Sequence, residues 1–135
     1  MWKLKAAAGR ILLAAGAALV ALPVVAQGAS PPAVDDLTRA RKLYMACAAC
    51  HNNDDTGQHT AGPNLKGVVG RPIGKAKGFA FSMALRNAKG RWTPERLDAF
   101  LKSPATEVPG TNMAFAGLSK DEDRAALVRY LQSTK

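Results

Sequence analysis

Hydrophobic positions recur with a helical period in three stretches of the chain. The first stretch follows Asp35 and Asp36, which can accept the free amides of a helix start, and it predicts a helix over residues 36–49. The second stretch begins at Thr93-Pro94, where threonine can cap the helix and proline suits its first turn, and Pro104 ends it. Each pattern leaves one apolar stripe that must pack against another part of the fold.

The third periodic stretch lies near the end of the sequence. Ser119 and Glu122 stand three residues apart, as in a capping box, and the helix is expected to run to about Ser133. Leu127 and Leu131 lie on its inward face. Residues 82–88 predict one short additional helix.

Two long stretches carry no helical period, and they are predicted to be loops. Residues 52–78 contain glycine at positions 57, 62, 67, 70, 74 and 78, and residues 105–118 have Pro109 and Gly110 at their centre. No stretch alternates convincingly in the manner of a strand. The expected fold class is therefore all-α, with three main helices, one short helix and loops too long to be organised by secondary structure alone.

The N-terminal segment differs in composition from the rest of the chain. Lys3, Lys5 and Arg10 precede a run of 16 uncharged residues, 11–26, that ends Val24-Val25-Ala26. This order is typical of a secretory signal, and the run falls short of the roughly 20 apolar residues of a comfortable membrane span. We expect a cleaved signal peptide over 1–26, with an uncleaved anchor as the alternative, a linker over 27–34 and a folded domain over 35–135. The expected destination is the periplasm or another exported space.

Length and composition indicate one folded domain. The chain has 135 residues, of which 21% are charged and 47% are hydrophobic, values that exclude a disordered protein. The net charge of +9 falls to +6 without residues 1–26, since 16 cations then face ten acidic residues. Two cysteines exclude a disulfide-dense scaffold and a four-cysteine metal site. The cations are not interleaved with aromatic residues, so no nucleic-acid partner is expected.

The two cysteines belong to one short motif. Cys47-Ala48-Ala49-Cys50-His51 is the C-x-x-C-H pattern of covalent haem attachment. Two thiols three residues apart at a helix end can each reach one haem vinyl group, and the next residue presents its imidazole to the iron. The same residues leave three alternatives: a plain cysteine pair, a redox C-x-x-C, or a zinc site that adds His59. A plain cysteine pair would leave the neighbouring His51 to chance. A redox C-x-x-C is usually surrounded by a βαβ pattern, which this sequence lacks. A zinc site would need the adjacent residues Cys50 and His51 to ligate one ion. We expect one haem c attached through Cys47 and Cys50.

From residue 36 to 133 the chain resembles the small monohaem class I cytochromes c, the group of mitochondrial cytochrome c and bacterial cytochrome c2. After the C-x-x-C-H motif, the resemblance rests on a series of further landmarks in order: Gly62-Pro63-Asn64-Leu65, Gly70-Arg71, Gly78-Phe79, Trp92 and Pro109-Gly110-Thr111-Asn112-Met113. It implies a small all-α fold wrapped around one haem and a one-electron carrier rather than an enzyme.

The axial ligands of the iron are expected on two sides of the haem. His51 is expected as the proximal ligand, and the resemblance implies that the carbonyl of Pro63 holds its second ring nitrogen. The sixth ligand should be a methionine sulfur. Met113 follows an irregular loop that can bring it inward, whereas Met45 lies on the proximal helix and Met83 is expected to fill the core.

Three more residues receive roles from the resemblance. Arg71 and Trp92 resemble the partners of the haem propionates, through a guanidinium fork and an indole N–H. Without the resemblance, a solvated loop charge and a plain core aromatic residue would be the simpler interpretations. His59 is expected to hydrogen-bond between loops.

The sequence departs from the family pattern in two ways. Phe81 and Phe100 stand where tyrosines are common and Leu85 where an asparagine is common, so the polar network around the haem is thinner. Uncharged residues also replace lysines that mitochondrial members often carry around the exposed haem edge, namely Ala46, Thr60, Ala105, Thr106 and Asn112. The mitochondrial docking mode is therefore not transferred to this chain.

The expected partners are redox proteins. A cytochrome bc1 complex, a terminal oxidase, a periplasmic dehydrogenase and a photosynthetic reaction centre are all compatible, and the protein is expected to be a monomer. Membrane contact is expected only through such complexes or through an uncleaved N-terminus. The alternative functions are a haem enzyme or ligand sensor with a vacated sixth position, or a membrane-tethered haem subunit of a larger complex.

Overall fold

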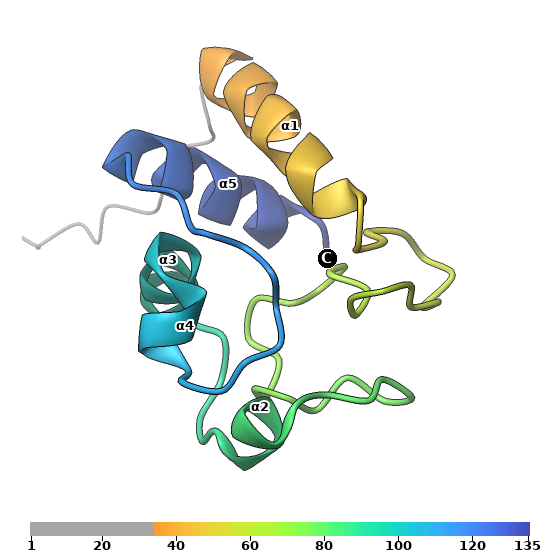
Figure 1. Ribbon diagram of the computed structural model, residues 1–135. Coiled ribbons are helices and arrows are strands. Elements are labelled where there is room, and N and C mark those ends of the chain that lie inside the picture. The colour runs from red at the N-terminus through yellow and green to blue at the C-terminus, as the bar shows by residue number, and fades with distance from the viewer. Residues whose placement is uncertain (1–33) are drawn as a thin grey trace, which may run out of the picture. The chain divides into compact units, whose positions relative to one another are not determined.

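The computed structural model describes residues 34–135 (Figure 1). Over this range the chain forms five helices, α1 (Val34–Ala48), α2 (Met83–Asn87), α3 (Pro94–Lys102), α4 (Pro104–Glu107) and α5 (Asp121–Ser133). No strand forms there, and Pro72 and Arg91 make one isolated antiparallel bridge. The all-α prediction is confirmed. None of the described helices has the length and apolar character of a bilayer span. The predicted signal peptide, and the predicted linker up to residue 33, lie outside the described residues.

Helices α1 and α3 begin where local chemistry favours a helix start. Helix α1 starts at Val34, so it includes the last residue of the predicted linker, and Asp35 and Asp36 lie in its first turn. Acidic side chains are favourable there because the helix N-terminus carries partial positive charge. At α3 the side chain of Thr93 accepts a hydrogen bond from the amide of Arg96 at 3.1 Å, as the cap prediction requires.

The C-terminal half differs from the prediction at two places. Helix α4 lies within the stretch predicted to be a loop, because Pro104 both follows the end of α3 and suits the first turn of a new helix. The predicted capping box is wrong: Lys120 is the cap of α5, and no side chain caps this helix. Its first turn holds Asp121, Glu122 and Asp123, whose charges favour a helix start.

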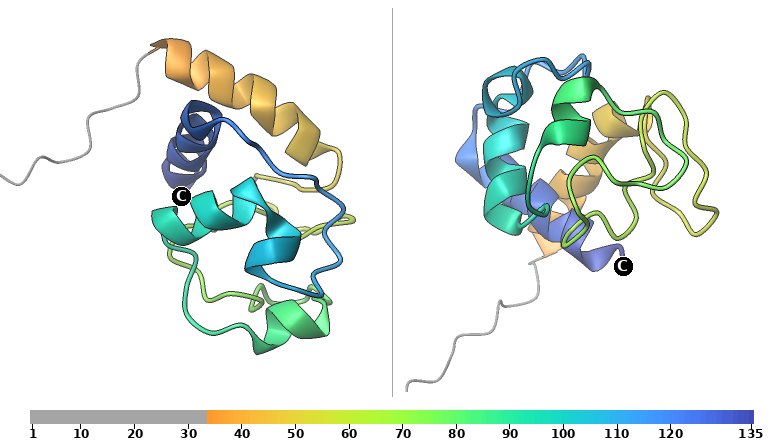
Figure 2. Two further views of the ribbon diagram at one scale, coloured as in Figure 1. Left: turned by 60° about the vertical axis from the view of Figure 1, so that its left-hand side comes forward. Right: turned by 90° about the horizontal axis from the view of Figure 1, so that it is seen from below.

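The core lies where the helices meet. Helix α5 contacts both α1 and α3, and Figure 2 shows α1 crossing over α5. Arg129 pairs with Asp36 at 2.6 Å, and the rings of Tyr44 and Tyr130 lie with centroids 5.3 Å apart and planes tilted by 51°, so α1 and α5 also meet through polar and aromatic contacts. The buried apolar residues come mainly from α3, α5 and the loops beside them: Val68, Ile73, Leu85, Trp92, Leu97, Phe100, Leu101, Val108, Leu127, Val128 and Leu131.

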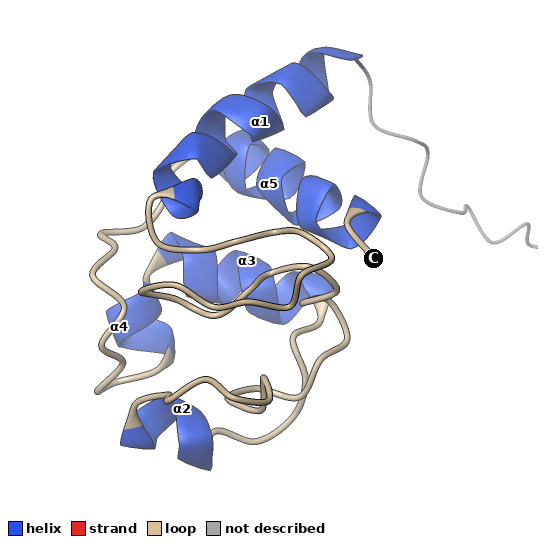
Figure 3. Ribbon diagram, turned by 90° about the vertical axis from the view of Figure 1, so that its right-hand side faces the viewer, coloured by secondary structure: helices blue, strands red, loops and turns tan. Residues whose placement is uncertain are grey.

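The chain between α1 and α2 has no regular secondary structure (Figure 3). Its backbone is held by hydrogen bonds to other loops, for example Gly70 N to Trp92 O at 2.8 Å and Ile73 N to Gly90 O at 3.1 Å. Gly70 has φ 87°, in the left-handed region that favours glycine. These bonds place residues 70–73 beside residues 90–92.

Candidate cofactor site

The two thiols lie at the C-terminal end of α1. Cys47 is in the last turn, and the amides of Cys50 and His51 donate to its carbonyl at 3.0 and 2.9 Å, which turns the chain back after the helix. Both cysteines are free thiols, Cys50 exposed and Cys47 half-buried against the core. Burial raises the pKa of the Cys47 thiol.

The imidazole of His51 is held from one side. Its Nδ1 lies 2.7 Å from the carbonyl oxygen of Pro63, so this nitrogen carries the proton and donates it to that bond. The described residues offer no partner to Nε2. A ligating histidine is commonly oriented by such a hydrogen bond through its other ring nitrogen.

Gly62 packs directly against the His51 ring. A Cβ atom at this position would lie 2.3 Å from His51 Cε1, closer than atoms can approach, so only glycine fits. The Gly62 amide also donates to the carbonyl of Cys50 at 2.6 Å. The loop that carries Pro63 is thereby fixed against the chain that carries the thiols.

The hydrogen bond between Tyr44 and the backbone of His51 was not predicted from the sequence. Its hydroxyl donates to the backbone carbonyl of His51 at 3.2 Å, and burial, with a lesser contribution from Tyr130, raises its pKa to about 12. Tyr44 lies within the helix predicted over residues 36–49, but periodicity can indicate only which side of a helix faces inward. The partner of its hydroxyl depends on how the chain turns after α1.

Of the three methionines in the described range, Met113 alone faces the core. Exposure alternates along residues 112–117: Asn112, Ala114 and Ala116 are exposed, whereas Met113 and Phe115 are half-buried and pack on the core. Met45 is 70% exposed and Met83 is 64% exposed. The prediction that Met83 fills the core is wrong, because α2 buries Leu85 and turns Met83 outward.

Arg71 and Trp92 both belong to the interior of the loop region. The guanidinium of Arg71 donates to the carbonyls of Asn64, at 2.8 Å, and Lys66, so Arg71 is not a free solvated charge. Its burial lowers its pKa. The Trp92 ring is buried, with its centroid 4.9 Å from that of Phe100. Its indole N–H has no hydrogen-bond partner within residues 34–135.

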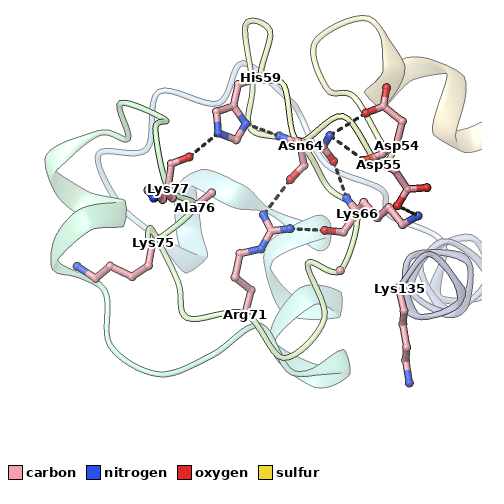
Figure 4. Close-up of a pocket in the computed structure, with 12 residues that line it drawn as sticks. Asp54, Asp55, His59, Asn64, Lys66, Arg71, Lys75, Ala76, Lys77 and Lys135 are labelled. Carbon is pink, nitrogen blue, oxygen red and sulfur yellow. Dashed lines mark hydrogen bonds and ion pairs between the residues drawn. The ribbon is translucent and has the colours of Figure 1, made fainter.

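His59 links two loops, as expected (Figure 4). Its Nε2 bonds the carbonyl of Lys77 at 2.9 Å and its Nδ1 accepts from the amide of Asn64 at 3.0 Å. Both nitrogens are engaged, so the alternative zinc site with His59 does not form. No group of three or more histidine, cysteine or acidic side chains that could hold a metal occurs among the described residues.

The same loops line an open hollow of about 550 Å³ on the side of His59 and Arg71 (Figure 4). The cations that line it mostly have partners already: Lys66 pairs with Asp55, Lys75 bonds the carbonyl of Arg86 at 2.9 Å, and Arg71 bonds two carbonyls. The hollow is therefore a consequence of the loop network and is separate from the two thiols and His51.

The residues around His51 fit a covalently bound haem. The chain offers two free thiols three positions apart, an imidazole whose Nε2 is unengaged and a thioether that faces the core. Imidazole and thioether are both ligands of haem iron. Most of the predicted site residues lie on the loops around the core. Trp92 is buried and Cys50 is exposed, and the others are half-buried: Cys47, His51, Pro63, Arg71 and Met113.

Comparisons with known proteins agree with this chemistry. The family model described as cytochrome c matches residues 37–135. A protein named cytochrome c-type cyt cy from Rhodobacter capsulatus is 48% identical over 92 residues, which are 68% of this chain and 45% of that protein. Cytochrome c of Tetrahymena pyriformis is 48% identical over 99 residues, 73% of this chain and 88% of that protein. The chain thus spans less than half of the bacterial relative and most of the ciliate one.

A solved structure shows the same fold. Cytochrome cH from Methylobacterium extorquens superposes with a TM-score of 0.68 at 37% sequence identity, over 73% of this chain and 98% of that one. Family members bind haem c through a cysteine pair, which here is Cys47 and Cys50, and they are electron carriers rather than enzymes. The chain belongs to the cytochrome c family.

Proposed function

We propose that this protein is a one-electron carrier whose single haem c is ligated by His51 Nε2 and Met113 sulfur. The observation that carries the proposal is the direction of Met113, the one methionine of the described range that packs against the core. When bound, haem c supplies a metal centre that exchanges single electrons with partner proteins.

The chain's own residues would keep this centre rigid and dry. Pro63 fixes the His51 ring through a hydrogen bond and Gly62 through close packing, so the proximal ligand is oriented before the haem is present. A soft sulfur ligand favours the reduced iron and raises the reduction potential. His51 and Met113 would together leave no open position for a substrate at the iron, which favours a carrier over a haem enzyme or a ligand sensor.

Arg71 and Trp92 are proposed as partners of the haem propionates. The indole N–H of Trp92 is free to donate, and the half-buried Arg71 can offset negative charge brought into the interior. The backbone carbonyls that already accept from Arg71 fix the direction of its guanidinium group.

The axial ligand is tested by the absorption spectrum of the protein produced in a haem-attaching periplasm. We expect a low-spin haem that survives acid-acetone extraction and a long-wavelength sulfur-to-iron band in the oxidised form. The band should disappear in Met113→Ala and persist in Met45→Leu and Met83→Leu, which are matched methionine replacements on the exposed surface. A band that survives Met113→Ala, or a high-spin spectrum of the unaltered protein, would overturn the ligand assignment.

We further propose that residues 1–26 direct export and are removed, which places the carrier in the periplasm or a similar space. The basic start, the uncharged run and the Val24-Val25-Ala26 end support this. Its partners would be redox proteins such as a bc1 complex, an oxidase, a dehydrogenase or a reaction centre, met by a monomeric carrier. Mass spectrometry of the protein from the periplasmic and membrane fractions tests it: a mature N-terminus at Gln27 is expected, and an intact chain in the membrane fraction would indicate a tethered subunit instead.

A further inference from the structure

Arg124 of α5 is the one charged side chain of the described range that is buried. It is 3% exposed, and every nitrogen of its guanidinium donates a hydrogen bond. Nε donates to Asp98 of α3 at 2.9 Å, and Nη2 donates to Asp121 at 2.6 Å. Nη1 donates to two backbone carbonyls, those of Leu118 and Ser119, at 2.9 Å each. A buried cation destabilises a fold unless it is paired and hydrogen-bonded, and here two carboxylates and two carbonyls compensate it.

The two carbonyls belong to the segment that carries Met113. Residues 108–119 connect α4 to α5 without regular secondary structure, and Figure 1 shows them as the long blue loop between these helices. Within the described structure, the hydrogen bonds of residues 109–117 stay inside this segment: Thr111 N to Val108 O at 3.0 Å, Met113 N to Thr111 Oγ1 at 3.3 Å and Phe115 N to Met113 O at 2.9 Å. The hydrogen bonds that join the segment to the helices are therefore made at its ends.

The C-terminal end of the segment is fixed against α3. The Leu118 amide donates to a backbone carbonyl of that helix at 2.8 Å. A Cβ atom at Gly117 would lie 2.2 Å from the carbonyl oxygen of Lys102, so the two backbones are in direct contact there. Arg124 completes this contact from α5, because its guanidinium bonds both the carbonyls that follow Gly117 and a carboxylate of α3. Within a few residues after Met113, the chain is thus held by two helices together.

We propose that Arg124 is a positioning residue for the sixth ligand of the iron, which holds the end of the segment 108–119 so that Met113 stays directed at the core. This inference rests on the proposed ligation by His51 and Met113. Without the guanidinium, two backbone carbonyls lose their donor, and the segment leaves the core more often. Because an external ligand can reach the iron only when Met113 has left it, the population of this open form can be measured as a ligand affinity.

Arg124→Lys is the substitution that isolates the role of the guanidinium. Lysine keeps the positive charge, but its single ammonium lacks the planar fork that bonds two carboxylates and two carbonyls at once. The matched control is Arg129→Lys on the same helix, since Arg129 is half-buried and pairs with Asp36 of α1 at 2.6 Å. Both variants weaken a contact between α5 and another helix, and only the first acts on the segment that carries Met113.

Titration of the oxidised holoprotein with imidazole tests the proposal. Imidazole is a nitrogen ligand of haem iron, and its binding in place of Met113 removes the sulfur-to-iron band. We expect the apparent affinity for imidazole to rise at least about tenfold in Arg124→Lys, which is the effect of losing a hydrogen bond to a charged group, and to change less than about twofold in Arg129→Lys. An equal rise in both variants would show a general loosening of α5 and would overturn the proposal, as would an unchanged affinity in Arg124→Lys.

The same titration in Met113→Ala separates this proposal from the ligand assignment. Met113→Ala alone should raise the affinity for imidazole, and adding Arg124→Lys should then change it less than about twofold, because Arg124 acts only through Met113. An unchanged affinity in Met113→Ala would refute the ligand assignment. If Met113→Ala raised the affinity and Arg124→Lys raised it further in that background, the ligand assignment would hold and the positioning role alone would fail.

Hydrogen–deuterium exchange gives a second readout, and Asp98→Asn gives a second variant. In Arg124→Lys we expect the amides of residues 111–118 to exchange several-fold faster and those of residues 52–82 to be unchanged, and equal acceleration of both would contradict the proposal. Asp98→Asn removes the carboxylate that fixes Nε and should raise the affinity for imidazole by a smaller factor, about threefold. If Arg124→Lys does not fold, this milder variant decides, and an unchanged affinity in Asp98→Asn would then overturn the proposal.

Discussion

The helices α1, α3 and α5 and the loops between α1 and α2 are stabilised by different forces. The helices bury apolar side chains against one another, and Leu127 at their centre is only 1% exposed. The loops add Val68 and Ile73 to this core and depend besides on close backbone approach, as at Gly62 and His51, and on single hydrogen bonds such as His59 to Lys77. We therefore expect the helical part to keep its packing without a cofactor, and the loops to depend more strongly on the haem that the family binds.

Removing the haem is expected to have the largest effect and to separate the two regions. Cys47→Ala with Cys50→Ala abolishes covalent attachment, so the loops lose the surface against which they are arranged. In hydrogen–deuterium exchange we expect residues 52–82 to exchange at nearly the rate of an unfolded chain, while α1 and α5 keep measurable protection. Met113→Ala, which retains the thiols, is the control. If α1 and α5 lost as much protection as residues 52–82, the helices and the loops would not be separately stabilised regions.

Leu127→Ala tests the helical region. It removes a fully buried side chain from α5 and should lower the free energy of unfolding by about 2–5 kcal/mol. Because Leu127 belongs to the helical core, we expect the sulfur-to-iron band to remain. Leu127→Met, which nearly conserves volume, should cost less than about 1.5 kcal/mol in chemical denaturation. A lost band in the folded Leu127→Ala variant would show that the two regions are not separable.

Gly62→Ala tests the loops and should give the opposite signature. The added Cβ would meet the His51 ring, so we expect a loss of about 1–3 kcal/mol together with a changed haem spectrum. Gly57→Ala is the matched control, since its φ of 67° imposes backbone strain but nothing lies within 4 Å of the added atom. If Gly57→Ala changed the spectrum as much as Gly62→Ala, the change could not be attributed to contact between residue 62 and the His51 ring.

The smallest effect is expected at the start of α5. A hydrogen bond from Arg124 lowers the pKa of Asp121 below its ordinary value of 3.8, so the bond contributes stability that is full above that pH and is lost as the pH falls through the lowered pKa. Asp121→Asn should therefore lower the unfolding temperature slightly at pH 7, and the effect should shrink as the pH falls below 3.8. Glu122→Gln removes a charge from the same turn without this bond. If the difference in unfolding temperature between variant and unaltered protein grew on acidification, the expected direction of the pH dependence would be contradicted.

The sequence predicted the helical region closely because it depends on local chemistry. The apolar stripes of the three main helices, and the cap at Thr93, are properties of neighbouring residues. It failed at α4 and at the cap of α5, where short-range signals compete and tertiary packing selects among them. It failed also at Met83, because a short helix has no clear stripe and the rest of the fold decides which side faces inward.

What the sequence determined by itself was the chemistry: two thiols and an imidazole at fixed spacing, which specify covalent haem before any fold is known. Tertiary structure decided the geometry, for three physical reasons. The Pro63 carbonyl meets His51 only when the chain closes over a separation of 12 residues, Met113 faces the core only because the segment 112–117 is laid against it, and residues 70–73 lie beside residues 90–92 only through hydrogen bonds between loops. Contacts between residues distant in the chain leave no period in the sequence, so only the folded chain shows them.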